Sequence, residues 1–313
     1  MDKLNMSNIP LAATLKWLMS RVWIIYLIIL VFCFTCMDLK TIEMRIKVRH
    51  LNDAIPDFSD MILFSKGQKL KHNIDWNPYR RYFGIILRYM PDDALTRQLL
   101  AFVDYHTGRE REAVGLYKSS ALINGQALFW SNYNLGVIYY KRGMWPQAGE
   151  YLLKAIESNP QLTILLMKNS IIYRQISVSP YFKYSLGEDI SEAQGQAYLL
   201  LLSSLYQMGQ YDKVFVVFKL AIANPNLTYQ DAYYYYGGLA LVGMGQINNA
   251  FLLFQKSLAI EKNNPEIYYY ISNIYQKAGQ LEQARSFLQA SYALHQKKDP
   301  RFPYEEKVTL HFF

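Results

Sequence analysis

The sequence predicts an all-α protein, in which a solenoid of helical hairpins follows a single transmembrane helix near the N-terminus. Three observations lead to this fold class. Glycines recur at a spacing close to 35 residues, which indicates internal repeats. Around these glycines, apolar residues are spaced three or four apart, as on one face of a helix. The longest apolar run, residues 22–37, precedes the repeats and is typical of a membrane span.

The transmembrane anchor is predicted at residues 17–38, after an N-terminal tail of residues 1–16. A helix over the apolar run 22–37 would be roughly 24 Å long, and extension back to Trp17 brings it near the ~30 Å of a bilayer core. Arg21, inside that extension, can reach the interface. A cleaved signal peptide is the alternative, but the end of the run lacks a small-residue cleavage pattern. An uncleaved span is therefore favoured.

The orientation of the anchor follows from layout rather than from charge. Basic residues flank the anchor on both sides, so the positive-inside rule does not decide between the two orientations. A short tail followed by a large C-terminal domain is the usual layout of a signal-anchor. We therefore expect a single-pass membrane protein whose repeat domain lies on the extracytoplasmic, periplasmic side.

Positive charge is concentrated near the anchor. The chain has a net charge of +8, and residues 1–91 hold 13 Lys and Arg against 7 Asp and Glu, a local excess of +6. Residues 39–53 are predicted as a basic juxtamembrane stalk. A basic belt beside a membrane favours anionic lipid head groups, and no nucleic-acid-reading motif accompanies the charge. The side chains predicted to face lipid are Lys40, Arg45, Lys47 and Arg49.

The clearest repeat unit runs from residue 132 to residue 160 and reads as helix, tight turn, helix and proline stop. Gly136 on the first helix and Ala148 on the second are small enough to let the two helices approach closely. Gly143 is placed where a left-handed residue must close the turn. Pro160 follows the second helix, where a backbone donor is dispensable.

This unit resembles the tetratricopeptide repeat family. Leu135, Gly136 and Tyr139 match its Leu-Gly-x-x-Tyr pattern, and Ala148 and Leu152 match the pattern of its second helix. The resemblance implies a right-handed superhelical solenoid whose inner groove is lined by first helices and binds protein partners. The same frame recurs at five turn glycines, namely Gly108, Gly143, Gly209, Gly245 and Gly279.

On this frame the repeat array spans residues 54–296, and residues 297–313 form a C-terminal tail. The five best repeats are predicted at 94–127, 129–162, 195–226, 231–264 and 265–298, and two degenerate units at 54–93 and 163–194. The tail contains Pro300 and Pro303 and cannot form another hairpin. Its apolar residues could fold back as a cap on the array, or insert into a partner.

The weakest unit is 163–194. Residues 162–176 form a convincing first helix, whereas residues 177–194 contain Pro180 and Gly187 and make a poor second helix. We predict an irregular excursion over 177–194. It is either a loop insertion or a special contact.

Tyrosine is abundant, with 27 residues in the chain. An aromatic and amide surface suits extended segments of partner proteins, because tyrosine offers contact area and a hydroxyl at low entropy cost. The alternative is that these side chains pack against neighbouring repeats. The residues that the frame places towards the groove are Tyr105, Tyr133, Tyr140, Tyr206, Tyr235, Tyr269 and Asn273.

Catalytic and cofactor motifs are not evident. The five histidines are scattered, and none pairs with Asp, Glu or Cys at metal-ligand spacing. Cys33 and Cys36 both lie in the predicted anchor, where two small apolar residues are the simplest interpretation. The sequence predicts a protein that is not an enzyme, with no cofactor, no metal, no nucleic acid and no small-molecule substrate.

Two functions remain. The first is a membrane-tethered scaffold that binds protein partners and assembles or stabilises a membrane or envelope complex. The alternative is an accessory factor that transiently handles an exported substrate in cell-surface polymer or secretion machinery.

Overall fold

The computed structural model describes residues 22, 26, 27, 55–65, 70, 72–123, 126–177, 179, 186–296, 303–308 and 310. The predicted stalk, its basic belt and nearly all of the predicted anchor lie outside these residues. No helix in the described part of the chain is both long enough and apolar enough to span a bilayer. The chain divides into two compact units, Met1–Pro56 and Asp57–Phe313, and the second is the subject from here on.

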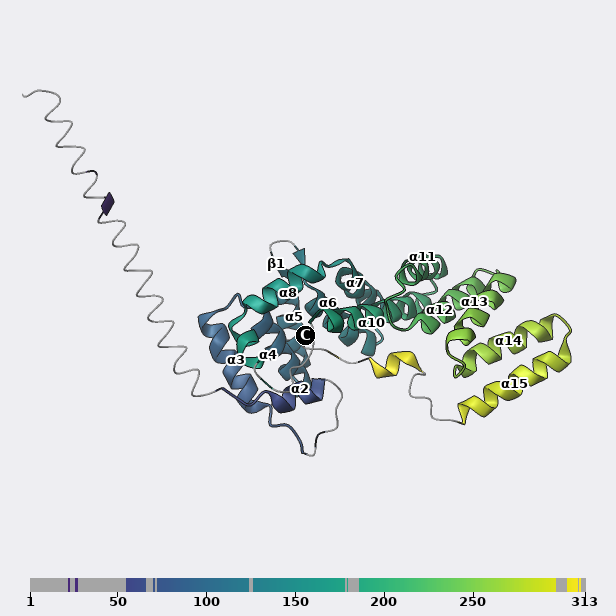
Figure 1. The fold of residues 1–313 in the computed structure, drawn as a ribbon, viewed down its shortest axis with the longest axis horizontal. Coiled ribbons are helices and arrows are strands. Elements are labelled where there is room, and N and C mark those ends of the chain that lie inside the picture. The colour runs from purple at the N-terminus through teal and green to yellow at the C-terminus, as the bar shows by residue number, and fades with distance from the viewer. Residues whose placement is uncertain are drawn as a thin grey trace, which may run out of the picture. The chain divides into compact units, whose positions relative to one another are not determined.

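The regular elements of this second unit are almost all helical (Figure 1). They are α2 (Ser59–Ser65), α3 (Asn77–Tyr89), α4 (Ala94–His106), α5 (Glu110–Ser120), β1 (Leu122–Ile123), β2 (Gln126–Ala127), α6 (Phe129–Lys141), α7 (Trp145–Glu157), α8 (Pro160–Asn169), α9 (Ile171–Ile176), α10 (Leu186–Gln207), α11 (Tyr211–Ile222), α12 (Gln230–Gly243), α13 (Ile247–Ile260), α14 (Pro265–Lys277), α15 (Leu281–His295) and the 3-10 helix η1 (Tyr304–Lys307).

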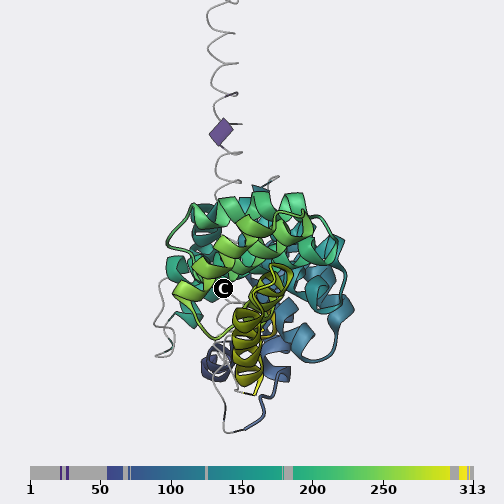
Figure 2. The same cartoon turned by 90° about the vertical axis from the view of Figure 1, so that its right-hand side faces the viewer.

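The helices pack as consecutive antiparallel pairs, as the sequence predicts. The pairs α4–α5, α6–α7, α12–α13 and α14–α15 are in close contact, and α10 contacts both α7 and α11. Figure 2 shows α14 and α15 side by side in front of the other hairpins. One small departure from the all-α prediction is the antiparallel ladder between α5 and α6, in which Leu122 lies opposite Ala127. The predicted all-helical hairpin fold is confirmed.

All five predicted turn glycines have positive φ angles, between 68° and 79°. A residue with a Cβ atom is strained in this region of backbone space. In the best-defined unit, Gly143 has φ 69°, and its N–H donates to the Tyr140 carbonyl at 2.9 Å, which closes the end of α6. The hairpin turns were therefore predictable from the glycines alone.

The two helices of that hairpin approach as closely as the small residues imply. A Cβ atom at Gly136 would lie 2.6 Å from Cγ of Leu152 on the facing helix α7. Ala148 is fully buried in the same interface. The prediction that Gly136 and Ala148 allow close packing is confirmed.

The unit predicted at 163–194 is wrong as a degenerate hairpin. Its expected first helix is two short helices, α8 and α9, which meet at Ser170. Residues 186–194, expected to be irregular, are the first turns of the 22-residue helix α10. Gly187 lies in the first turn of that helix, where a glycine costs less than in the interior.

Ser170 explains the break between α8 and α9. Its Oγ accepts from the Ile172 N–H at 3.3 Å, which starts α9, and donates to Oδ2 of Asp93 at 2.9 Å. The other Asp93 oxygen, Oδ1, accepts from the Thr96 N–H at 2.7 Å at the start of α4. One carboxylate thus joins two helix N-termini that are far apart in the sequence. The two short helices therefore both contact α4, and α8 also contacts α6 and α10.

An aromatic cluster closes the N-terminal end of this unit. His106, at the end of α4, stacks on Trp76 at a centroid distance of 5.7 Å and meets the edge of Phe64 at 4.8 Å. Its Nε2 is buried without a hydrogen-bond partner among the described residues. Burial, and then the charge of Lys141, lowers the pKa of His106 to about 4.

We expect this histidine to make the fold less stable in mild acid. The folded pKa lies below the unfolded value near 6.5, so its contribution is complete above pH 6.5 and is lost as the pH falls towards 4. The loss should be about 2–3 kcal/mol, after allowance for partial exposure. His106→Phe should flatten the dependence of the unfolding free energy on pH, as measured by urea unfolding of the full chain. A His106→Phe chain whose stability falls with acid as steeply as that of the wild type would contradict this assignment.

Candidate partner-binding face

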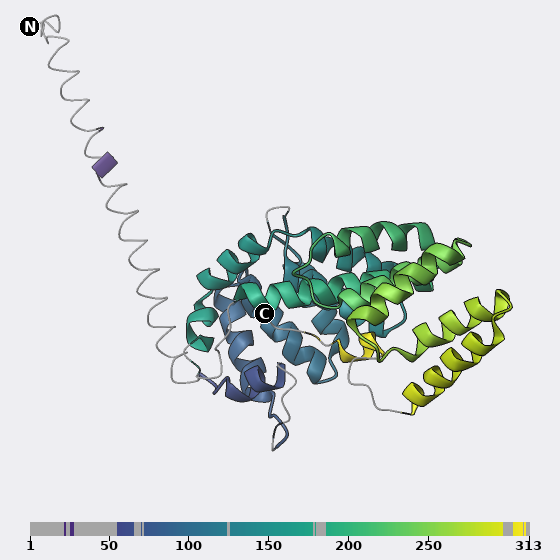
Figure 3. The same ribbon diagram turned by 45° about the vertical axis from the view of Figure 1, so that its right-hand side comes forward.

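The C-terminal tail returns to the array and lies on its first helices. We call residues 303–310 the tail segment; of these, 303–308 and 310 are described. Its helical turn η1 contacts α10, and Tyr304 and Glu305 bond to side chains of α12. Figures 1 and 3 show η1 in yellow beside α10 and α12, on the side away from α11. Of the two alternatives for the tail, the described residues show a return to the array, and they contact several first helices instead of covering the last hairpin alone.

Tyr304 is the most extensively hydrogen-bonded residue of the tail segment among those described. Its ring is 2% exposed, and its hydroxyl donates to Oδ2 of Asp231 at 2.8 Å. The same hydroxyl accepts from Nδ2 of Asn264 at 3.4 Å. Asp231 lies in the first turn of α12 and Asn264 is the N-cap of α14, and both are fully buried. Tyr304 therefore bonds to two neighbouring hairpins at once.

Glu305 accepts a hydrogen bond from one tyrosine of α12. The hydroxyl of Tyr236 donates to Oε1 of Glu305. Burial, and then the negative charge of Glu305, raises the pKa of Tyr236 well above its ordinary value. The same two causes raise the pKa of Tyr140 to about 12, and its hydroxyl forms a 2.8 Å hydrogen bond with Oγ of Ser203. Both tyrosines are therefore protonated at neutral pH.

Two aliphatic side chains of the tail segment are also buried. Val308 and Leu310 are 1% and 3% exposed, so three of the described side chains of the tail segment are fully withdrawn from water. Burial of an aliphatic side chain of this size contributes roughly 1.5–3 kcal/mol. The tail segment is bound as a peptide would be, with a tyrosine anchor, a carboxylate contact and apolar ends. We call its binding surface the tail-bearing face and define it by Tyr140, Asp231, Tyr235, Tyr236 and Asn264.

The structure separates the residues that were expected to line a groove. Burial, and then the charge of Glu305, raises the pKa of Tyr140 to about 12, and Tyr235 is buried with its ring 5.3 Å from that of Tyr236. Tyr206 is half-buried, and its ring is 6.1 Å from that of Tyr236. Tyr269 is 45% exposed. The two others, Tyr105 and Asn273, are half-buried.

Tyr133 does not present its side chain to an open groove. It is fully buried, stacks on Phe129 at 5.8 Å, and its hydroxyl donates to Oε1 of Gln196 on α10. It packs between two repeats, which was the alternative interpretation of the tyrosines. The expected groove position of Tyr133 is therefore corrected.

Three residues of the tail-bearing face were not singled out from the sequence as binding residues. Tyr236 is one of four consecutive tyrosines, and only the packing of α12 shows which of them meets the tail. Asp231 and Asn264 occupy the start of a helix, where Asp and Asn are common for capping and dipole reasons. Their sequence positions alone therefore carried no signal of a site.

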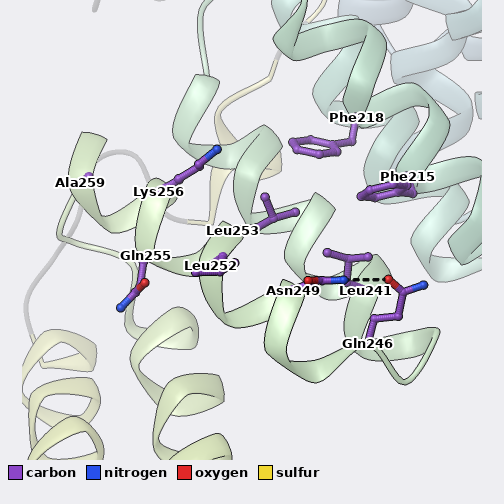
Figure 4. Close-up of a pocket in the computed structure, with 10 residues that line it drawn as sticks. All are labelled: Phe215, Phe218, Leu241, Gln246, Asn249, Leu252, Leu253, Gln255, Lys256 and Ala259. Atoms are coloured by element: carbon purple, nitrogen blue, oxygen red, sulfur yellow. Dashed lines mark hydrogen bonds between the residues drawn. The ribbon is translucent and has the colours of Figure 1, made fainter.

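The second helices carry two apolar hollows, each of about 540 Å³. Figure 4 shows the first, between α11 and α13, with Phe215 on one wall and Leu252 on the other. Asn249 donates to Oε1 of Gln246 at 3.2 Å at its edge. The second hollow lies among α7, α10 and α11. No group of three His, Cys, Asp or Glu side chains in the described part of the chain is placed to hold a metal ion.

Comparisons with known proteins identify similar solved structures. No curated protein matches this chain. Among solved structures, one described as the crystal structure of MamA is 17% identical, with a TM-score of 0.47, and the match covers 63% of this chain and 94% of that one. A second, the crystal structure of MamA protein, is 18% identical with the same TM-score, and covers 70% and 98%.

Family profiles match two parts of the chain that together make up less than half of it. Residues 131–161, in the α6–α7 hairpin, match a tetratricopeptide repeat profile. Residues 241–302, which include α13, α14 and α15, match another. The resemblance to this family is confirmed for those segments. Two separate segments of this chain are thus tetratricopeptide-type hairpins.

Proposed function

We propose that this chain is a membrane-tethered tetratricopeptide scaffold that binds protein partners and so assembles or stabilises a membrane or envelope complex. One observation carries the proposal: the first helices of the array already bind a peptide segment, which belongs to the chain's own tail. Tyr304 is buried with its hydroxyl bonded to Asp231 and Asn264, and Val308 and Leu310 of the same segment are buried as well, which supports a surface that takes up aromatic and aliphatic side chains. A surface that holds an extended segment in this way has the properties of a protein-binding site.

The membrane tether is the second part of the proposal, and it is supported by the sequence. Residues 22–37 form an apolar run of the right character for a span, with basic residues on both sides. In this arrangement Lys40, Arg45, Lys47 and Arg49 meet anionic head groups, and the repeat domain lies on the extracytoplasmic side. The tether keeps the tail-bearing face near a membrane complex.

The full chain, with an affinity tag and extracted from its own membranes in mild detergent, tests this function. We expect its capture to recover one or more proteins in stoichiometric amounts, identified by mass spectrometry. A control chain, in which an unrelated transmembrane helix replaces residues 17–38, should recover the same proteins, because the repeat domain makes the contacts. Alkaline washing of the membranes should leave the full chain in the pellet.

The outcomes separate the possible functions. Weak, exchangeable capture of an exported polypeptide or polymer would favour the accessory factor over the scaffold. Recovery of lipids with no reproducible protein would contradict both. Release of the chain by the alkaline wash would remove the membrane tether from the proposal and leave protein binding in place.

A further inference from the structure

We propose that the tail-bearing face is a peptide-binding site that the chain's own tail segment closes. A protein partner opens it by supplying a segment of the same chemistry: a tyrosine, an acidic residue directly after it, and aliphatic side chains beyond. The inference rests on the function proposed above, because it names the site and the kind of partner.

The tyrosine requirement comes from the two groups that meet the Tyr304 hydroxyl. The hydroxyl donates to Oδ2 of Asp231 at 2.8 Å, and Nδ2 of Asn264 donates to the hydroxyl oxygen at 3.4 Å. A phenol both donates and accepts, so it satisfies the two partners together. A phenylalanine would not supply this hydrogen bond to the fully buried carboxylate of Asp231. Sites that hydrogen-bond a buried hydroxyl discriminate strongly against a ligand that lacks it. The pocket therefore selects tyrosine over phenylalanine.

The acidic requirement comes from the Tyr236 hydroxyl on α12, which donates to the Glu305 carboxylate. Burial, and then the charge of Glu305, raises the pKa of Tyr236 well above its ordinary value, so this hydroxyl is protonated at neutral pH. A glutamine at this position would keep the shape but lose the charge-assisted hydrogen bond.

The attachment of the tail segment is suited to exchange. Seven residues, 296–302, separate it from the C-terminal end of α15, so it competes with any free peptide from within the same chain. A short linker gives an effective concentration on the order of 1 mM. A free peptide with a dissociation constant of roughly 10–100 µM would therefore bind about 10- to 100-fold more weakly to the closed site. A protein partner overcomes the competition from the tail segment through additional contacts outside the site.

A labelled synthetic peptide of residues 300–310 tests the proposal, with fluorescence anisotropy measured against the full chain in mild detergent. We expect weak binding to the wild-type chain and binding about 10- to 100-fold tighter to Tyr304→Ala, whose own tail no longer competes. The matched control is Tyr292→Ala, at a tyrosine of α15 that is 63% exposed. It should bind the peptide as weakly as the wild type.

The peptide's own chemistry gives a second measurement. Against the Tyr304→Ala chain, peptides carrying Tyr304→Phe or Glu305→Gln should bind at least about tenfold more weakly than the unchanged peptide. If Tyr304→Ala does not fold, Tyr304→Phe in the full chain keeps the ring and should still increase peptide affinity. Adding Tyr236→Phe to the Tyr304→Ala or the Tyr304→Phe chain should lower its affinity for the peptide, because the hydroxyl that donates to the glutamate carboxylate is gone.

Several results would overturn the proposal. Equal peptide affinity of the wild-type and Tyr304→Ala chains would show that the tail does not close a site. Equal binding of all three peptides would show an apolar contact without the stated selectivity. Conversion of a dimer to a monomer by Tyr304→Ala would place the tail segment in a second copy of the chain.

The experiment distinguishes this inference from the proposed function, because the peptide requires no knowledge of a partner. Tighter peptide binding by Tyr304→Ala, together with a capture experiment that recovers no protein, would contradict the scaffold function and support the closed site. Capture of a protein partner with no response to the tail variants would leave the scaffold and remove the closed site.

Discussion

Tyr133→Ala should lower the free energy of unfolding by about 3–5 kcal/mol, the range for truncating a large aromatic side chain in a packed interior. The ring is fully buried between α6 and α10, against Phe129 and with its hydroxyl on Gln196. Truncation leaves a cavity at the junction of two repeats and removes a hydrogen bond. Urea unfolding of the full chain, followed by circular dichroism, measures the loss.

Two further variants show the origin of this effect. Tyr133→Phe keeps the ring and should lose only about 1 kcal/mol, the share of the hydrogen bond. Tyr269→Ala, at a tyrosine 45% exposed, should change stability by less than about 0.5 kcal/mol. If Tyr133→Ala were as harmless as Tyr269→Ala, the side chain would have to be open to solvent and its burial would be wrong. A partner-binding assay with Tyr133→Ala is therefore a test of folding before it is a test of the groove.

Gly238→Ala is the second large effect, and we expect a loss of about 3 kcal/mol. A Cβ atom at this position would lie 2.5 Å from Cε1 of Phe254, which is fully buried and stacks on Tyr270 at 5.5 Å. The ring has no room to withdraw, so α12 and α13 must separate or the ring must leave its rotamer. The overpacking cost exceeds the gain of up to ~1 kcal/mol that alanine has over glycine in a helix.

The matched control is Gly115→Ala on α5. Nothing lies within 4 Å of a Cβ atom there, so only the helix propensity changes. We expect Gly115→Ala to be neutral or to stabilise the chain by up to ~1 kcal/mol. Thermal unfolding of the two variants side by side gives the comparison. A stabilised Gly238→Ala chain would show that the two helices are not in close contact.

The features that the sequence predicts well are those with local causes. The turn glycines could be predicted because a positive φ angle is a requirement of the backbone at a single position. Gly136 could be predicted because Leu152, which it faces, lies on the next helix of the same hairpin. The helical hairpins follow from the apolar period in the same way. These signals need no knowledge of the rest of the fold.

The features that it misses depend on distant parts of the chain. The frame placed Tyr133 towards a groove, but Gln196, from the extended start of α10, covers it. The break at Ser170 depends on Asp93, which is 77 residues away in sequence. The tail-bearing face depends on Tyr304 reaching Asp231 across 73 residues. A periodic pattern carries no information about such pairings.

The double contact of Tyr304 has a consequence for the mechanics of the array. In a solenoid each repeat contacts only its neighbours, so stability is approximately a sum of repeats and of the interfaces between them. By bonding to both α12 and the start of α14, the tail adds to one of those interfaces without belonging to a repeat. The cooperativity between the last two hairpins then varies with the occupancy of the site. A bound partner would have to replace the two hydrogen bonds of Tyr304 to keep that cooperativity.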